Sequence, residues 1–152
     1  MEIYERLSHR LLAKFWQPIP ASGRRMELVK NNYLYWEFIR NLRNLEGVRE
    51  GFIQQETITQ EQQQAYMSKY NDCFYICLYN GEPAGYIGVI DDDIRVATHP
   101  DYQGKGIASF MVTEIKKIQP SSVAKIKIDN KASLALFKGC GFKIKYYLLE
   151  QQ

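Results

Sequence analysis

The stretch of residues 96–108 constrains the fold of this chain more than any other part of its sequence. Val96-Ala97-Thr98 ends an alternating, strand-like run, and a turn that contains Gly104 and Gly106 follows it. Apolar residues then recur every three or four positions from Ile107, which predicts a helix directly after the turn. The start of such a helix offers unpaired N–H groups and a positive dipole end, and glycines let an anion approach the backbone closely. The stretch therefore predicts mixed helices and strands with an anion-binding loop.

The other predicted elements surround this stretch on both sides. The strongest strand signal is a hairpin, in which Asn80-Gly81 separates two apolar runs at 73–79 and 84–90. Segment 45–58 lacks strong periodicity and predicts a loop with at most a helical turn. Alternation predicts strands at 94–98 and 124–128, and further strands are expected at 26–30 and 142–149. Helical spacing predicts helices at 3–15, 34–44, 59–70, 107–118 and 133–140.

Charge, hydropathy and cysteine content exclude several classes of protein. The chain has a formal net charge of +3, from 20 basic and 17 acidic residues, and the basic residues are spread along it. We therefore expect no nucleic-acid partner. Because no apolar run approaches about 18 residues, we expect neither a signal peptide nor a membrane span. Three cysteines are typical of reduced thiols in a cytoplasmic protein, and with only two histidines no metal site is expected.

Two motifs resemble those of the GCN5-related N-acetyltransferase (GNAT) family. The stretch Gln103-Gly104-Lys105-Gly106-Ile107-Ala108 matches the family signature Gln/Arg-x-x-Gly-x-Gly/Ala, directly after a strand that ends in Val-x-x-x-Pro. The second motif is similar to Asn-x-x-Ala-x-x-Leu-Tyr-x-x-x-Gly-Phe, and its matching residues are Asn130, Ser133, Leu136, Phe137, Gly141 and Phe142. The resemblance covers roughly residues 73–149.

The resemblance implies a fold and a donor. The fold is α+β, with a mixed, mostly antiparallel central sheet of six to seven strands flanked by helices. Residues 24–152 would form the acetyltransferase domain, and residues 1–23 an extra N-terminal helix and linker. The donor would be acetyl-CoA, with its pyrophosphate on the amides of Gln103, Gly104, Lys105, Gly106, Ile107 and Ala108. Its pantetheine arm would contact Val96, Ala97, Thr98, Asn130, Ser133 and Phe137, and Asn130 would equally serve as the N-cap of the last helix.

The residues that would move protons are less well defined. Asp92 and Asp93 lie where family members carry a carboxylate base, and Asp92 has the closer matching spacing, although an acidic turn explains both residues equally simply. The usual general acid of the family is a tyrosine, and Phe137 stands at that position. Three alternatives follow: a phenol such as Tyr146 or Tyr147 enters the site, water protonates the leaving thiolate, or the chain binds CoA without efficient turnover.

The acceptor is predicted from a loose similarity. Trp36, Arg40 and Arg43 resemble a Trp and Arg-Asn stretch in two branches of the family, which acetylate aminosugars on nucleotide carriers and the amino termini of ribosomal proteins. The resemblance implies direct transfer to the primary amine of a small molecule such as a nucleotide-linked aminosugar. A peptide acceptor and a non-catalytic acyl-CoA-binding module are the alternatives. Segment 45–58 would close the acceptor groove over a small molecule or leave it open for a peptide. A homodimer is a further expectation.

Overall fold

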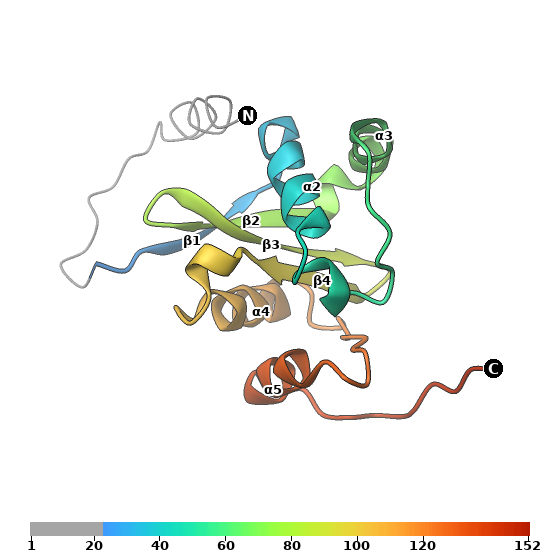
Figure 1. The fold of residues 1–152 in the computed structure, drawn as a ribbon. Helices are drawn as coiled ribbons and strands as arrows, with labels where there is room; N and C mark the ends of the chain where they lie inside the picture. Colours follow the sequence, from blue (N-terminus) through green and yellow to red (C-terminus); the bar gives the residue numbers. More distant parts are fainter. Residues whose placement is uncertain (1–22) are drawn as a thin grey trace.

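The computed structural model describes residues 23–152 (Figure 1), so the predicted helix at 3–15 and nearly all of the predicted extension lie outside the described residues. In chain order, the structure contains β1 (Met26–Lys30), α2 (Trp36–Asn44), α3 (Gln60–Tyr70), β2 (Phe74–Tyr79), β3 (Glu82–Ile90), β4 (Asp93–Thr98), α4 (Ile107–Ile118) and α5 (Lys131–Gly139). Single 3-10 turns lie at Tyr33–Tyr35, Arg49–Gly51, Asn71–Cys73 and Pro100–Tyr102. This is an α+β fold, as the resemblance implies.

The four strands form one antiparallel sheet in the order β1-β2-β3-β4. The β2–β3 hairpin turns at Asn80 and Gly81, whose φ angles of +50° and +85° suit a two-residue turn. Across the β3–β4 pair, Tyr86 lies opposite Ala97 and Gly88 lies opposite Arg95. The predicted hairpin and the predicted strands at 26–30 and 94–98 are confirmed.

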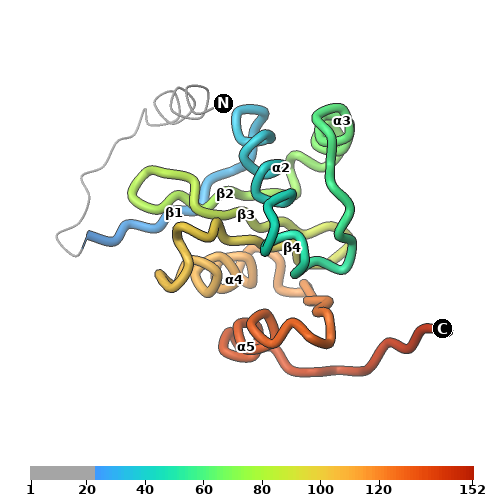
Figure 2. The backbone as a smooth tube through the Cα atoms, in the orientation of Figure 1, coloured from blue at the N-terminus to red at the C-terminus, as the bar shows by residue number. Residues whose placement is uncertain are grey.

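The prediction of six to seven strands is wrong for residues 23–152, which form four. The predicted strand segments 124–128 and 142–149 join no strand. The nearest approach to a fifth strand is a single parallel bridge between Val123 and Asp93. An alternating segment becomes a strand only when a neighbour takes up its backbone hydrogen bonds. These segments have none, and Ile128 and Tyr146 are 99% and 72% exposed. Figure 2 shows the C-terminal segment running away from the sheet.

Helices cover both faces of the sheet (Figure 1). One core lies under α2 and α3, where buried side chains such as Leu42 and Met67 pack with Ile76 and Tyr86 of the sheet. The second core lies on the opposite face, where Met111 and Ile115 of α4 pack with strand residues. β4 is the edge strand between the two layers, so its free edge is accessible from both.

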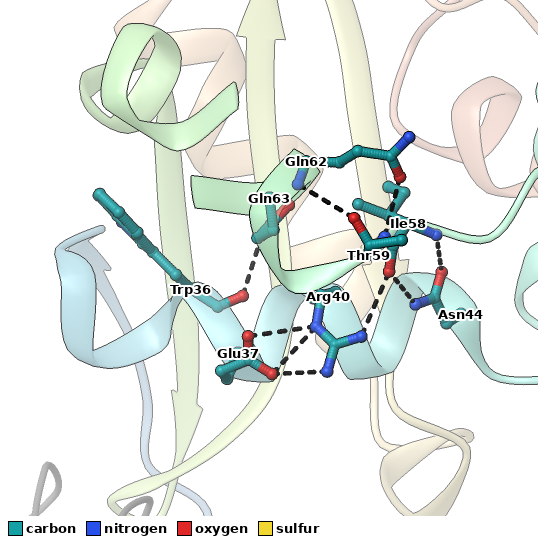
Figure 3. Close-up of polar contacts among 8 residues, drawn as sticks. All are labelled: Trp36, Glu37, Arg40, Asn44, Ile58, Thr59, Gln62 and Gln63. Carbon is teal, nitrogen blue, oxygen red and sulfur yellow. Dashed lines mark hydrogen bonds and ion pairs between the residues drawn. The ribbon is translucent and has the colours of Figure 1, made fainter. Parts of the chain in front are cut away.

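The start of α3 follows the capping box that the sequence predicts. The Thr59 hydroxyl accepts a hydrogen bond from the Gln62 backbone N–H at 3.2 Å, and the Gln62 side chain accepts one from the Thr59 N–H at 2.9 Å (Figure 3). The cap ends segment 45–58 at a fixed point, so the loop is held by α2 at one end and α3 at the other. Among residues 23–152 there is no helix with the length and apolarity needed to cross a membrane.

Candidate functional site

The predicted anion loop has the geometry of a cradle. Gly104 and Gly106 adopt φ angles of +78° and +79°, and a Cβ atom built on either glycine would have no atom within 4 Å. Gly106 is the N-cap of α4 and provides no side-chain cap, so the N–H groups of Ile107 and Ala108 begin the helix without an acceptor among residues 23–152. Open space in front of an uncapped helix start suits a phosphate group.

The loop before the cradle is held by local contacts. The Asp101 N–H donates to Nδ1 of His99 at 3.1 Å, and the ring of Tyr102 packs edge-on against Tyr79. The Lys105 ammonium lies 5.6 Å from the centroid of the Tyr79 ring. His99 therefore stabilises the turn, and Lys105 is directed toward Tyr79 rather than into the cleft that the other loop residues line.

A single cleft of about 910 Å³ joins the cradle to the free edge of β4. Its walls come from residues 93–98 of β4, from the loop and first turn of α4, from α5, and from segment 45–58. It brings together these residues predicted for the donor: Val96, Ala97, Thr98, Gln103, Gly104, Gly106, Ile107, Ala108, Asn130, Ser133 and Phe137. Residues far apart in sequence thus meet in one cavity, and of the predicted donor residues Lys105 alone is not part of its wall.

The free edge of β4 offers backbone groups to this cleft. The Ile94 N–H donates across that edge to the Val123 carbonyl at 2.9 Å. Backbone groups alternate between the two edges of a strand, so Val96 and Thr98 direct their N–H and C=O groups to the same side. Apart from the single bridge to Val123, no strand in the described part of the chain pairs with this edge. An extended amide-containing ligand can therefore bind to β4 in the place of a fifth strand.

Asn130 connects the donor side of the cleft to the loop above it. Its Oδ1 accepts from the Ser133 N–H at 3.1 Å, which makes it the N-cap of α5, and its Nδ2 donates to the Gly51 carbonyl at 3.2 Å. Nearby, Lys127 Nζ donates to the Glu50 carbonyl at 3.0 Å. The loop is therefore fixed to the segment before α5 as well as to α2.

The two predicted carboxylates lie in different environments. Asp92 is exposed in a turn with φ +64°, and its Oδ1 accepts from the Ser121 hydroxyl at 3.0 Å. Asp93 begins β4, lines the cleft, and has a side chain only 19% exposed. Its Oδ2 lies 3.8 Å from a guanidinium nitrogen of Arg95, and its buried Oδ1 has no hydrogen-bond partner among residues 23–152. Of the two, Asp93 is the carboxylate available to the cleft.

The phenols in the cleft are not those that the sequence indicates. Tyr146 and Tyr147 are 72% and 80% exposed and lie outside the cleft wall, whereas Tyr66, Tyr86 and Tyr102 line it. Burial raises the pKa of each of these three phenols above its ordinary value, so all three stay protonated near neutral pH. Tyr66 and Tyr86 reach the cleft from α3 and β3, which lie outside the two family motifs, so no motif marks either phenol as a proton donor.

Trp36 and Arg40, both predicted for the acceptor, lie outside the cleft and make internal contacts (Figure 3). Trp36 donates from its indole to Asn71 at 2.8 Å, and its carbonyl accepts from Gln63 at 2.9 Å. The Arg40 guanidinium contacts the Glu37 carboxylate at 2.8 Å and donates to the Ile58 carbonyl at 3.2 Å. Both side chains hold α2 against α3 and the end of the loop.

Arg43, the third predicted acceptor residue, does line the cleft. Its guanidinium stacks 3.9 Å from the centroid of the Phe52 ring, and Nη2 donates to the Gln54 carbonyl. Burial is the main cause that lowers the pKa of Arg43, and the nearby Arg95 and Arg49 add to the effect. One turn of α2 therefore separates Arg40, which makes structural contacts, from an arginine at the cavity.

Asn44 fixes the loop at its second end, which gives a testable prediction. Its side chain donates to the Ile58 carbonyl and accepts from the Ile58 N–H, both at 2.8 Å (Figure 3). Asn44→Ala leaves the Ile58 N–H unpaired and leaves Arg40 as the remaining donor to the Ile58 carbonyl, so we expect a loss of about 1–3 kcal/mol in the free energy of unfolding, measured by urea denaturation. We expect CoA affinity to change by less than about twofold. A larger fall in CoA affinity, with stability unchanged, would contradict this assignment.

Comparison with known proteins was informative for family and fold. The model of the Acetyltransferase (GNAT) family matches residues 35–142. A domain from Methanocaldococcus jannaschii has a TM-score of 0.70 at 20% identity, over 79% of this chain and 89% of that one. Spermidine N-acetyltransferase from Vibrio cholerae, in complex with CoA and spermine, has a TM-score of 0.73 at 15% identity, over 83% and 85%. An aminoglycoside N-acetyltransferase in complex with CoA has a TM-score of 0.66 at 12% identity, over 88% and 97%.

These identities show a shared fold and carry no information about the acceptor. No curated protein sequence matches this chain significantly. Within residues 23–152 there is also no cluster of three or more histidine, cysteine, aspartate or glutamate side chains that could hold a metal ion.

Proposed function

Because the chain belongs to the acetyltransferase (GNAT) family, we propose that it transfers the acetyl group of acetyl-CoA to the primary amine of a small molecule. A nucleotide-linked aminosugar is the first acceptor to test. The observation that carries the proposal is the continuous cleft, in which an open glycine cradle, an unpaired strand edge and a carboxylate share one cavity.

The cradle fits a CoA donor on its own geometry. Residues 103–108 would bind the pyrophosphate, since both glycines leave open space in front of uncapped N–H groups. Val96 and Thr98 would hydrogen-bond the amides of the pantetheine arm through the free edge of β4. Ala97, Asn130, Ser133 and Phe137 would line the arm on both sides. CoA complexes of structurally similar proteins support the same choice of donor.

Asp93 would prepare the amine for transfer. The reaction forms a C–N bond and breaks the C–S bond of the thioester, so the amine must lose a proton and the thiolate must gain one. Removing a proton from an amine with a pKa of about 10.4 costs roughly 4–5 kcal/mol at pH 7. A carboxylate in the cleft wall can accept that proton, directly or through a water molecule.

The leaving thiolate does not require a dedicated acid. Phe137 is buried and packs against Phe142 at a centroid distance of 5.2 Å, so no phenol stands at the usual position. An ordinary thiol has a pKa near 8.5, and a thiolate is therefore a tolerable leaving group. We expect protonation by water, with Tyr102 as the nearest phenol to the cradle in sequence. Tyr146, which the sequence favoured, would need the C-terminal segment to move.

Closure of the loop supports a small acceptor. Segment 45–58 lines the cleft and is held by Asn44, Arg43, Lys127 and Asn130. A groove for an extended peptide would have to remain open between α2 and the segment before α5, where these bonds cross. The peptide acceptor stays as the second candidate, because a terminal residue alone could enter.

A transfer assay tests the proposal. The chain is incubated with radiolabelled acetyl-CoA and a cell extract, and the mixture is passed through a size filter. Label in a new small product is the expected result, and a sample without the chain gives the background. Label retained on protein would favour the peptide acceptor. Label in neither fraction, with acetyl-CoA still bound, would overturn the proposal of amine acetylation.

The homodimer stays a prediction. Residues 144–149 expose five large apolar side chains, Ile144, Tyr146, Tyr147, Leu148 and Leu149. Burying such a strip is favourable, and a second copy is one surface that can do so. Sedimentation of the full chain as a single species of about 36 kDa supports the dimer, and a species of 17.8 kDa at all concentrations contradicts it.

A further inference from the structure

The cleft wall carries four side chains with hydrogen-bond donors, each from a separate element. Arg43 comes from α2, Tyr66 from α3, Tyr86 from β3 and Arg95 from β4, and all four line the same cavity. Tyr86 lies opposite Ala97 in the β3–β4 register, and Ala97 is two residues from Arg95 along β4. The side chains of Tyr86 and Arg95 therefore lie on the same face of the sheet. Arg43 and Arg95 each act electrostatically on both phenols. The four groups therefore form one cluster, which we call the donor cluster.

The donor cluster has unused capacity. Nη1 of Arg43 is buried and has no hydrogen-bond partner among the described residues. Arg95 has one acidic neighbour, Asp93, at 3.8 Å, which is longer than a hydrogen bond, and its side chain is 41% exposed. Burial raises the pKa of Tyr66 and Tyr86, so their hydroxyl groups keep a proton to donate. Two guanidinium groups and two phenols offer donors without a matching set of acceptors.

We propose that the donor cluster binds an anionic group, phosphate or carboxylate, on the amine that this chain acetylates. The inference rests on the proposed function and narrows its substrate class. Guanidinium groups recognise both anions through charge-assisted hydrogen bonds. The acidic side chains of the cleft wall are Asp93 and Glu56. In this arrangement Asp93 would face the ammonium group of the acceptor. An acceptor with ammonium groups alone would place its positive charge against two arginines.

Paired ligands test the charge requirement without turnover. The chain is first saturated with CoA, which occupies the cradle, and is then titrated by calorimetry with glucosamine 6-phosphate or glucosamine. A second pair, 4-aminobutyrate and butylamine, tests a carboxylate in place of the phosphate. We expect the anionic member of at least one pair to bind about 10- to 100-fold more tightly, as for a charge-assisted hydrogen bond. The pair that shows the preference identifies the anion.

Variants connect the preference to the cluster. Arg95→Gln and Arg43→Gln should each reduce the preference by about tenfold or more. Arg49→Gln is the matched control, because it removes the same positive charge from a nearby residue that lies outside the cleft wall. Arg43 also contacts Phe52 and Gln54, so thermal melting must show that its variant is folded. Arg95 carries the test if the Arg43 variant does not fold.

The outcomes separate the inference from the proposed function. Equal binding of both members of each pair, or a preference that persists in both arginine variants, overturns the inference. Parallel assays of CoA release with the same four amines test transfer itself. Anion-dependent binding without CoA release from any amine would support the donor cluster and count against amine acetylation. Acetylation of the amines that lack an anionic group, with no effect of the variants, would support amine acetylation and overturn the inference about the donor cluster.

Discussion

Replacing Gly106 with asparagine is expected to weaken CoA binding by about 100-fold or more while the chain stays folded. Gly106 has a φ of +79°, which asparagine tolerates better than other residues with a side chain. The new side chain would enter the open space in front of α4 and cap the N–H groups that the phosphate needs. Losing two charge-assisted hydrogen bonds accounts for a change of this size. Calorimetric titration with CoA measures it.

Gly81→Asn is a closely matched control for this substitution. Gly81 also has a positive φ, +85°, and a Cβ built there has nothing within 4 Å. It lies in the β2–β3 turn, outside the cleft wall. The same change should therefore leave CoA affinity unaltered, and melting curves of the two variants should be similar. If CoA affinity is unchanged in Gly106→Asn, the assignment of the cradle as the pyrophosphate site is wrong.

Asp93→Asn is expected to lower kcat/KM for acetyl transfer by about 10²- to 10⁴-fold, the range for loss of a general base. Asparagine keeps the size of the side chain but cannot accept the proton of the amine. Asp93 has no part in the cradle, so CoA affinity should change by less than about threefold. Initial rates of CoA release at saturating acetyl-CoA, with an acceptor found in the transfer assay, give the measurement.

Asp92→Asn separates the two neighbouring carboxylates. Asp92 is exposed, lies in the turn before β4 and accepts a hydrogen bond from Ser121. We expect its substitution to change kcat/KM by less than about fivefold. The opposite pattern, with activity lost in Asp92→Asn and kept in Asp93→Asn, would assign the base to the residue with the closer family spacing. Loss in both variants would indicate that the turn itself positions the strand.

Local sequence patterns were reliable where a short segment decides its own conformation. The hairpin at Asn80-Gly81, the capping box at Thr59 and the glycine turn before Ile107 all have the predicted geometry. Each depends on backbone angles or hydrogen bonds within a few residues. For the same reason, all predicted donor residues in the loop and on β4 except Lys105 line one cleft, since strand, turn and helix are consecutive in the chain.

The predicted strands at 124–128 and 142–149 show what a local sequence pattern cannot predict. Segment 124–128 alternates as β4 does and segment 142–149 is rich in apolar residues, yet neither is paired. Alternation describes which side chains share a face, whereas a strand also needs a neighbour for its backbone. The sequence contains no signal that states whether this neighbour is present.

The sequence by itself determined the anion loop, the α+β class and the family resemblance, because these depend on contiguous residues. Only the tertiary structure distinguished Arg43 from Arg40, and Asp93 from Asp92, since a shift of three positions in the first pair and one in the second decides whether a side chain lines the cavity. It alone brought Tyr66, Tyr86 and Arg95 to the same place, from elements that are separate in the chain. Cavity walls are made by packing, and packing joins residues that no local pattern relates.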